Sequence, residues 1–122
     1  MKYSRTIEGD SIVIADENGK VLLIIEEAMA DGFMSFTLRG ELLNEIAYEL
    51  EDEVMAGLSV IKQVKINMSE LSYIGSVGLR SLLKIQNIID ETDNAELVLE
   101  NLDDNIKQVF ISNGFLDLFS IK

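Results

Sequence analysis

The sequence predicts one α/β domain in which helices pack on a β-sheet. The chain has 122 residues, which is close to the usual size of a single domain. Its composition, 48% hydrophobic and 26% charged residues, is that of an ordinary globular protein. Short apolar runs of strand length alternate with amphipathic segments of helical spacing. Such alternation is typical of an α/β layer with its helices on the face of the sheet.

The composition also narrows the classes of function. Ten Lys+Arg against 22 Asp+Glu give a formal charge of −12, which disfavours binding to nucleic acid or to an anionic membrane. Cysteine and histidine are absent, so the usual thiol nucleophile, general base and metal ligands are missing. We therefore expect no enzyme activity, no metal and no cofactor. No apolar run approaches the ~20 residues that span a bilayer, so we expect a cytoplasmic protein without membrane insertion.

The first third of the chain predicts a β-hairpin. Apolar and polar residues alternate over Ser11–Asp16, and Lys20–Ile25 is an apolar run. Between them, Asn18 and Gly19 are residues that tolerate a positive φ in a tight turn. The acidic and small residues over 26–32 fit either a loop or a short helix.

The middle of the chain predicts a strand, a helix and a second strand. Met34–Arg39 alternates as a strand does, and Gly40 is expected to end it. Apolar residues at helical spacing then run from Leu43 to Leu58, and the acidic residues 49–53 are interpreted as a solvated face. Gln63–Asn67 fits the second strand. The polar residues that follow, up to position 79, are expected to form a connection.

The last third predicts two helices and two strands. A helix is expected to start at Ser76, followed by a strand over Glu96–Glu100. The acidic pair Asp103-Asp104 favours a helix start, and Phe115–Ile121 is expected to end in a short strand. The core predicted from these patterns consists of Leu38, Ile46, Leu50, Val54, Val64, Ile66, Leu82, Ile89, Leu97, Leu99, Ile106 and Phe110.

Ser76, at a predicted helix start, has two interpretations. Its hydroxyl could cap the helix by accepting a hydrogen bond from a first-turn N–H group. The same N–H groups and the helix dipole would also favour a phosphate there, and Gly75 and Gly78 would let another protein approach closely. As a nucleophile Ser76 would need a base, and only Lys84, two turns further along, could serve. Hydrolase activity is therefore not expected.

Three segments resemble STAS domains, the anti-sigma factor antagonist family. Val64–Leu79, which reads VKINMSELSYIGSVGL, resembles the signature of the family. Gly40-Glu41-Leu42 resembles its Gly-x-Leu after an early strand, and Ile106–Phe119 resembles its last helix and tail. The resemblance implies a STAS-like mixed β-sheet with helices packed on it over residues 34–122. Residues 1–33 would then be an N-terminal hairpin extension, packed on the domain, that is atypical for the family.

The resemblance also implies a function and a site. In antagonists of this family the motif reads Asp-Ser-x-Gly, and a cognate anti-sigma kinase phosphorylates the serine and binds the unphosphorylated form. Ser76 and Gly78 match the serine and the glycine, whereas Gly75 stands in place of the aspartate. This implies a partner-switching module that binds an anti-sigma factor or serine kinase-like protein and is phosphorylated on Ser76. The implied partner contacts are Tyr73, Gly75, Ser76, Val77, Gly78 and Leu79.

Three alternatives stay open. Tyr73 could pack its ring on the end of the sheet in place of contacting a partner. The domain could also be a phosphorylation-independent STAS scaffold or accessory domain of a signalling or transporter assembly, which the glycine at position 75 favours. A third class is binding of a small ligand or nucleotide.

Overall fold

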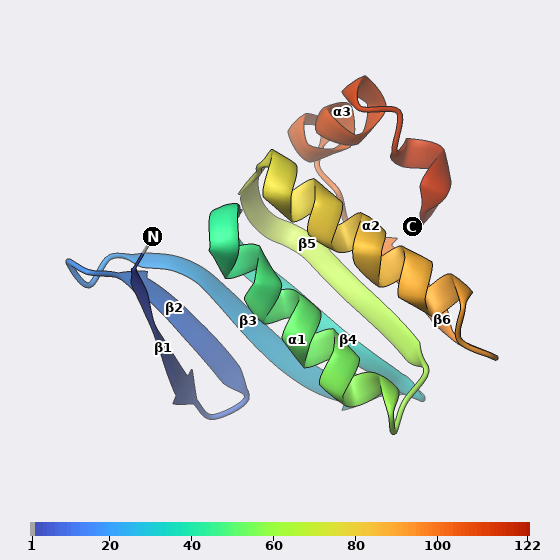
Figure 1. The fold of residues 1–122 in the computed structure, drawn as a ribbon, viewed down its shortest axis with the longest axis horizontal. Helices are drawn as coiled ribbons and strands as arrows, with labels where there is room; N and C mark the ends of the chain where they lie inside the picture. The colour runs from blue at the N-terminus through green and yellow to red at the C-terminus, as the bar shows by residue number, and fades with distance from the viewer. Residues whose placement is uncertain (1) are drawn as a thin grey trace.

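The computed structural model describes residues 2–122 and places seven strands in one mixed sheet (Figure 1). The strands lie in chain order; β1 to β4 pair antiparallel, and the pairs from β4 to β7 are parallel. The α/β prediction, with a mixed sheet and an added N-terminal hairpin, is confirmed. The elements are β1 (Tyr3–Glu8), β2 (Ser11–Asp16), β3 (Val21–Ala30), β4 (Phe33–Leu42), α1 (Ala47–Leu58), β5 (Gln63–Ile74), α2 (Ser76–Asp90), β6 (Glu96–Glu100), α3 (Asp104–Ser112) and β7 (Ser120–Ile121).

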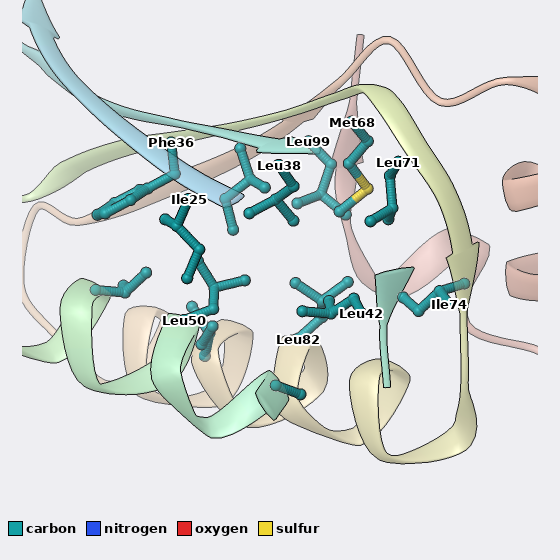
Figure 2. Close-up of a cluster of buried hydrophobic side chains, with 14 of the residues drawn as sticks. Ile25, Phe36, Leu38, Leu42, Leu50, Met68, Leu71, Ile74, Leu82 and Leu99 are labelled. Carbon is teal, nitrogen blue, oxygen red and sulfur yellow. The ribbon is translucent and has the colours of Figure 1, made fainter. Parts of the chain in front are cut away.

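Helices α1 and α2 lie side by side across one face of the sheet (Figure 1). The strands turn alternate apolar side chains such as Phe36 towards these helices, where they meet Leu50 of α1 and Leu82 of α2 (Figure 2). Burial of each such side chain contributes about 1.5–3 kcal/mol, which makes this layer the main source of stability. Every core residue predicted from the sequence is buried. At the C-terminal end, Phe110 of α3 packs edge-on against Phe119, with ring centroids 5.4 Å apart.

The predicted N-terminal hairpin is confirmed as β2 and β3. The Asp16 carboxylate accepts hydrogen bonds from the N–H groups of Asn18 and Lys20, at 2.8 and 3.0 Å, and so closes its turn. Residues 26–32, for which a loop or a short helix was expected, instead continue β3 to Ala30. A two-residue turn of Asp31 and Gly32 follows, with φ values of 54° and 81°.

Two strand ends differ from the prediction. Gly40 does not end β4, which runs on to Leu42; the φ of Gly40 is +113°, a conformation that glycine adopts freely. A side chain at this position would also meet the Leu22 carbonyl oxygen, 2.3 Å from an ideal Cβ. Similarly, β5 continues through the expected connection to Ile74. β4 and β5 therefore remain paired up to Leu42 and Ile74.

The helices begin close to the predicted positions. α1 starts at Ala47, after a short 3₁₀ turn over Asn44–Ile46, because the φ of Asn44 is 53° and no helix can pass through that residue. α2 starts at Ser76 as predicted. At the start of α3 the Asp103 carboxylate accepts a hydrogen bond from the Ile106 N–H at 2.8 Å, which confirms the predicted acidic helix start. The division of the chain into an N-terminal extension, residues 1–33, and a domain over residues 34–122 stays a prediction.

Candidate functional site

The candidate site lies where β5 passes into α2. β5 ends at the buried residue Ile74, Gly75 alone makes the connection, and α2 begins at Ser76. The Gly75 N–H donates a hydrogen bond to the Leu42 carbonyl at 3.0 Å. Since Leu42 is the last residue of β4, the start of α2 is fixed to two paired strands.

Ser76 is exposed on the first turn of α2, but it does not cap the helix. The capping position belongs to Gly75, and no side chain within residues 2–122 caps α2. The interpretation of Ser76 as a cap is therefore wrong by one residue. The N–H groups of the first turn have no side-chain acceptor there, which is the arrangement that a phosphate on Ser76 would complete.

The two glycines of the motif have different roles. Gly78 is buried, and an ideal Cβ there would lie 2.3 Å from the Leu42 carbonyl oxygen and 3.0 Å from the Ile74 side chain. Only glycine fits this contact, so Gly78 sets the helix against the sheet and does not leave room for a partner as the sequence suggested. Gly75 is partly exposed, and a Cβ there would meet Leu43 at 3.2 Å.

The other predicted contact residues are divided between surface and core. Tyr73 is 52% exposed, and Val77 is half-buried next to Ser76. Leu79, in contrast, is 3% exposed and belongs to the core. The surface part of the predicted site therefore consists of Tyr73, Gly75, Ser76 and Val77, whereas Gly78 and Leu79 support it from below. Gly78 and Leu79 are both buried in the free protein, and direct partner contact by these two residues stays a prediction.

A groove of about 210 Å³ lies between α1 and α2, and its lining includes Val77, the residue that follows Ser76 in the chain. It is lined by Tyr48, Glu51, Val77, Arg80, Ser81 and Lys84. The Glu51 side chain is buried on its floor, where it accepts a short hydrogen bond from the Ser81 hydroxyl and pairs with the Lys84 ammonium at 3.2 Å. Lys84 is thus the counter-ion of Glu51, which removes it as the candidate base for Ser76.

The groove was not predicted from the sequence, because Glu51 was assigned to a solvated face of the helix. The signal that could have shown its burial is the helical spacing of Ala47, Leu50, Glu51 and Val54, which places all four side chains on one stripe. A carboxylate inside an apolar stripe requires a partner, and α2 supplies two.

Comparison with known proteins assigns the family. The STAS domain model matches residues 25–122, which is most of the chain. The chain belongs to the STAS domain family. The matched region begins within β3, so β1 and β2 lie outside it.

Several proteins similar to this STAS domain are named anti-sigma factor antagonists, and one similar structure is that of a sulfate transporter family protein from Wolinella succinogenes. The chain is 32% identical over 92 residues to BtrV of Bordetella bronchiseptica, named a candidate anti-sigma factor antagonist; the match covers 75% of this chain and 78% of BtrV. An anti-sigma factor antagonist from Mycobacterium paratuberculosis has a TM-score of 0.71 at 18% identity, over 81% of this chain and 84% of that one. The Bacillus cell-fate determinant SpoIIAA, in its phosphorylated form, has a TM-score of 0.63 at 16% identity, over 80% and 90%. Both structures have the same fold as this chain.

The described part of this STAS domain has neither a metal-binding cluster nor a membrane-spanning helix. Among residues 2–122, no three His, Cys, Asp or Glu side chains are arranged to hold a metal ion. None of the helices in the described chain has the length and apolar character needed to cross a membrane.

A second cluster of charged groups connects β1 and β3 of this STAS domain to α1. Arg5 of β1 pairs with Glu49 at 3.0 Å and with Glu53 at 3.8 Å. Glu27 of β3 lies beside Glu53, and its Oε1 atom is buried. Burial raises the pKa of Glu27 to about 7, and the hydrogen bond to Glu53, the charge of Glu53 and the charge of Asp10 act in the same direction, opposed by Arg5.

The raised pKa of Glu27 predicts that the contribution of this residue to the free energy of unfolding falls as the pH rises from 4.5 to about 7. Because Glu27 holds its proton more tightly in the folded chain than at its ordinary pKa of 4.5, its contribution is complete below pH 4.5 and is lost as the pH rises through about 7. Glu27→Gln cannot ionise, so at pH 8 we expect it to be more stable than the wild type. With allowance for solvent screening, the gain is on the order of 1 kcal/mol.

Urea unfolding at pH 4.5 and pH 8 measures the effect of Glu27→Gln. Glu17→Gln, in the turn between β2 and β3, removes the same charge from an exposed position and is the control. A difference between Glu27→Gln and the wild type that is equal at the two pH values would contradict the assignment.

Proposed function

We propose that this STAS domain is an anti-sigma factor antagonist, a protein-binding module of a partner-switching pathway and not an enzyme. Its partner is an anti-sigma factor with serine kinase activity, which phosphorylates Ser76. The observation that carries the proposal is the exposed hydroxyl of Ser76 on the first turn of a helix that Gly75 and Gly78 fix to the sheet. The name of BtrV, a relative 32% identical to this chain, supports the same function.

Phosphorylation at this position would change the surface without disturbing the fold. A phosphoserine carries a charge of about −1.5 to −2, and the positive end of a helix dipole tolerates such a charge. Ser76 is exposed and is not part of the buried core, whereas Gly78 and Leu79 are buried. A partner that packs on Tyr73, Ser76 and Val77 would therefore meet a new dianion on an otherwise unchanged surface.

A second candidate function is a phosphorylation-independent STAS scaffold. The observation that favours it is Gly75, which supplies no carboxylate before the serine. Mass spectrometry of the protein purified from its own cells at several growth stages separates the two functions. A Ser76 that is unmodified in every state favours the scaffold, and a phosphate on Ser76 in any of them favours the switch.

Small-ligand binding has less support. Cavities of about 170, 210 and 260 Å³ lie on the described surface. Sites for drug-sized ligands typically measure ~300–1,000 Å³.

The proposed protein partner is tested by calorimetric titration of the unphosphorylated protein with a candidate anti-sigma factor from the same organism. Saturable binding is expected, and an absence of binding would contradict the antagonist function.

A further inference from the structure

Arg80 lies one helical turn after Ser76, and both side chains are exposed on α2. Residues four apart on a helix have Cβ atoms about 5–6 Å from each other. Helical side chains also lean towards the N-terminus of the helix, so the side chain of Arg80 extends towards the turn that holds Ser76. A guanidinium at this position is within reach of any anion on the Ser76 oxygen.

Arg80 is also the available cation of the groove between α1 and α2. The other cation that lines this groove, Lys84, is engaged by the buried carboxylate of Glu51 at 3.2 Å. Over residues 2–122, Arg80 forms no salt bridge. In a chain with a formal charge of −12, an arginine without a carboxylate partner beside an exposed serine needs an explanation.

We propose that Arg80 is the internal partner of phosphorylated Ser76, and that this pairing withdraws its guanidinium from the groove between α1 and α2. The inference rests on the proposed phosphorylation of Ser76. The planar guanidinium binds phosphate oxygens through two parallel N–H donors, a stronger contact than a hydrogen bond between neutral groups. Gly75, unlike an aspartate, places no second carboxylate beside the phosphate to repel it.

The pairing explains how one phosphate can change a wider surface. In the unphosphorylated protein the groove presents Arg80 to an acidic side chain of a partner, next to Tyr48 and Val77. After phosphorylation the cation is neutralised and the first turn of α2 carries the net negative charge of the phosphate. An acidic partner group then loses its counter-ion and meets repulsion of like charge.

Phosphoserine introduced at position 76 by genetic encoding tests the pairing without any kinase. The second pKa of the phosphate, about 6 for a free phosphoserine, is read from the ³¹P NMR shift as a function of pH. We expect this pKa to be about 0.5 lower with Arg80 present than in Arg80→Gln, because the guanidinium favours the dianion. Equal pKa values in the two proteins would overturn the proposal.

Two further variants make the result specific. Lys20→Gln removes the same charge from the turn between β2 and β3, and we expect it to leave the phosphate pKa at the wild-type value; a shift as large as that of Arg80→Gln would mean an effect of net charge alone. Arg80→Lys keeps the charge and should retain part of the shift. If Arg80→Gln loses its folded spectrum, Arg80→Met replaces it as a neutral variant of similar length. Since the phosphate is installed without a kinase, a failure here leaves the proposed kinase reaction untouched, and a failure of that reaction leaves the pairing testable.

Discussion

Gly78→Ala is expected to destabilise the domain by about 3 kcal/mol, because overpacking against a backbone atom forces the helix and the sheet apart. The added methyl group would lie 2.3 Å from the Leu42 carbonyl oxygen and 3.0 Å from Ile74. The preference of helices for alanine over glycine offsets only about 1 kcal/mol of the strain. Urea unfolding followed by circular dichroism measures the effect.

Gly75→Ala is the matched control for this prediction. Its φ of −94° suits alanine, and the nearest atom to the added Cβ is the Leu43 side chain at 3.2 Å. We expect a change in stability within about 1 kcal/mol, the usual range for a cap substitution between small residues. Equal stability of Gly78→Ala and Gly75→Ala would show that α2 does not rest on the end of β4 as described.

Ser76→Asp is expected to weaken binding of the anti-sigma factor by at least about tenfold, equivalent to roughly 1.4 kcal/mol. The aspartate would place a permanent charge on the exposed first turn of α2, where the helix tolerates it but a partner built for a neutral hydroxyl does not. Calorimetric titration of the purified partner into each variant gives the dissociation constants.

Two other variants show whether the effect belongs to position 76. Ser76→Ala keeps the surface neutral, and we expect it to bind within about threefold of the wild type. Ser4→Asp introduces the same charge on the exposed edge strand β1 and should also bind normally. Wild-type affinity of Ser76→Asp would refute the switch, whereas equal losses in Ser76→Asp and Ser4→Asp would indicate a general electrostatic effect.

The helices and the core could be predicted from the sequence because their apolar spacing is regular. α2 was placed from Ser76 onwards, and β6 has its predicted bounds. The second half of β5 was missed for a physical reason. Its buried residues Met68, Leu71 and Ile74 are three apart in place of two, because irregularities in the pairing with β4 insert extra residues into β5.

The N-terminal strands show two other limits of pattern reading. Asp31-Gly32 is a strong signal for a two-residue hairpin turn, and its two positive φ values fit that signal, but the acidic residues before it obscured the end of β3. β1 has almost no buried side chains, so its sequence carries little apolar alternation to detect. An edge strand is specified by its neighbour more than by its own residues.

The surface of the candidate site could be predicted only in part. The position of Ser76 followed from a local helix start together with the family resemblance. The burial of Gly78 and the floor of the groove at Glu51 depend on contacts with Leu42 and α2, which are distant in sequence. Arg80 had no distinguishing pattern, because its significance comes from the lack of a carboxylate partner in the folded chain.

The most direct test of the proposed function is the intact mass of the protein after incubation with ATP and the candidate anti-sigma kinase. The wild type is expected to gain the mass of one phosphate, and Ser76→Ala is expected to gain none. An unchanged wild-type mass, with a kinase shown to be active on a control substrate, would contradict the phosphorylation switch. A phosphate gained equally by Ser76→Ala would contradict the assignment of the switch to Ser76.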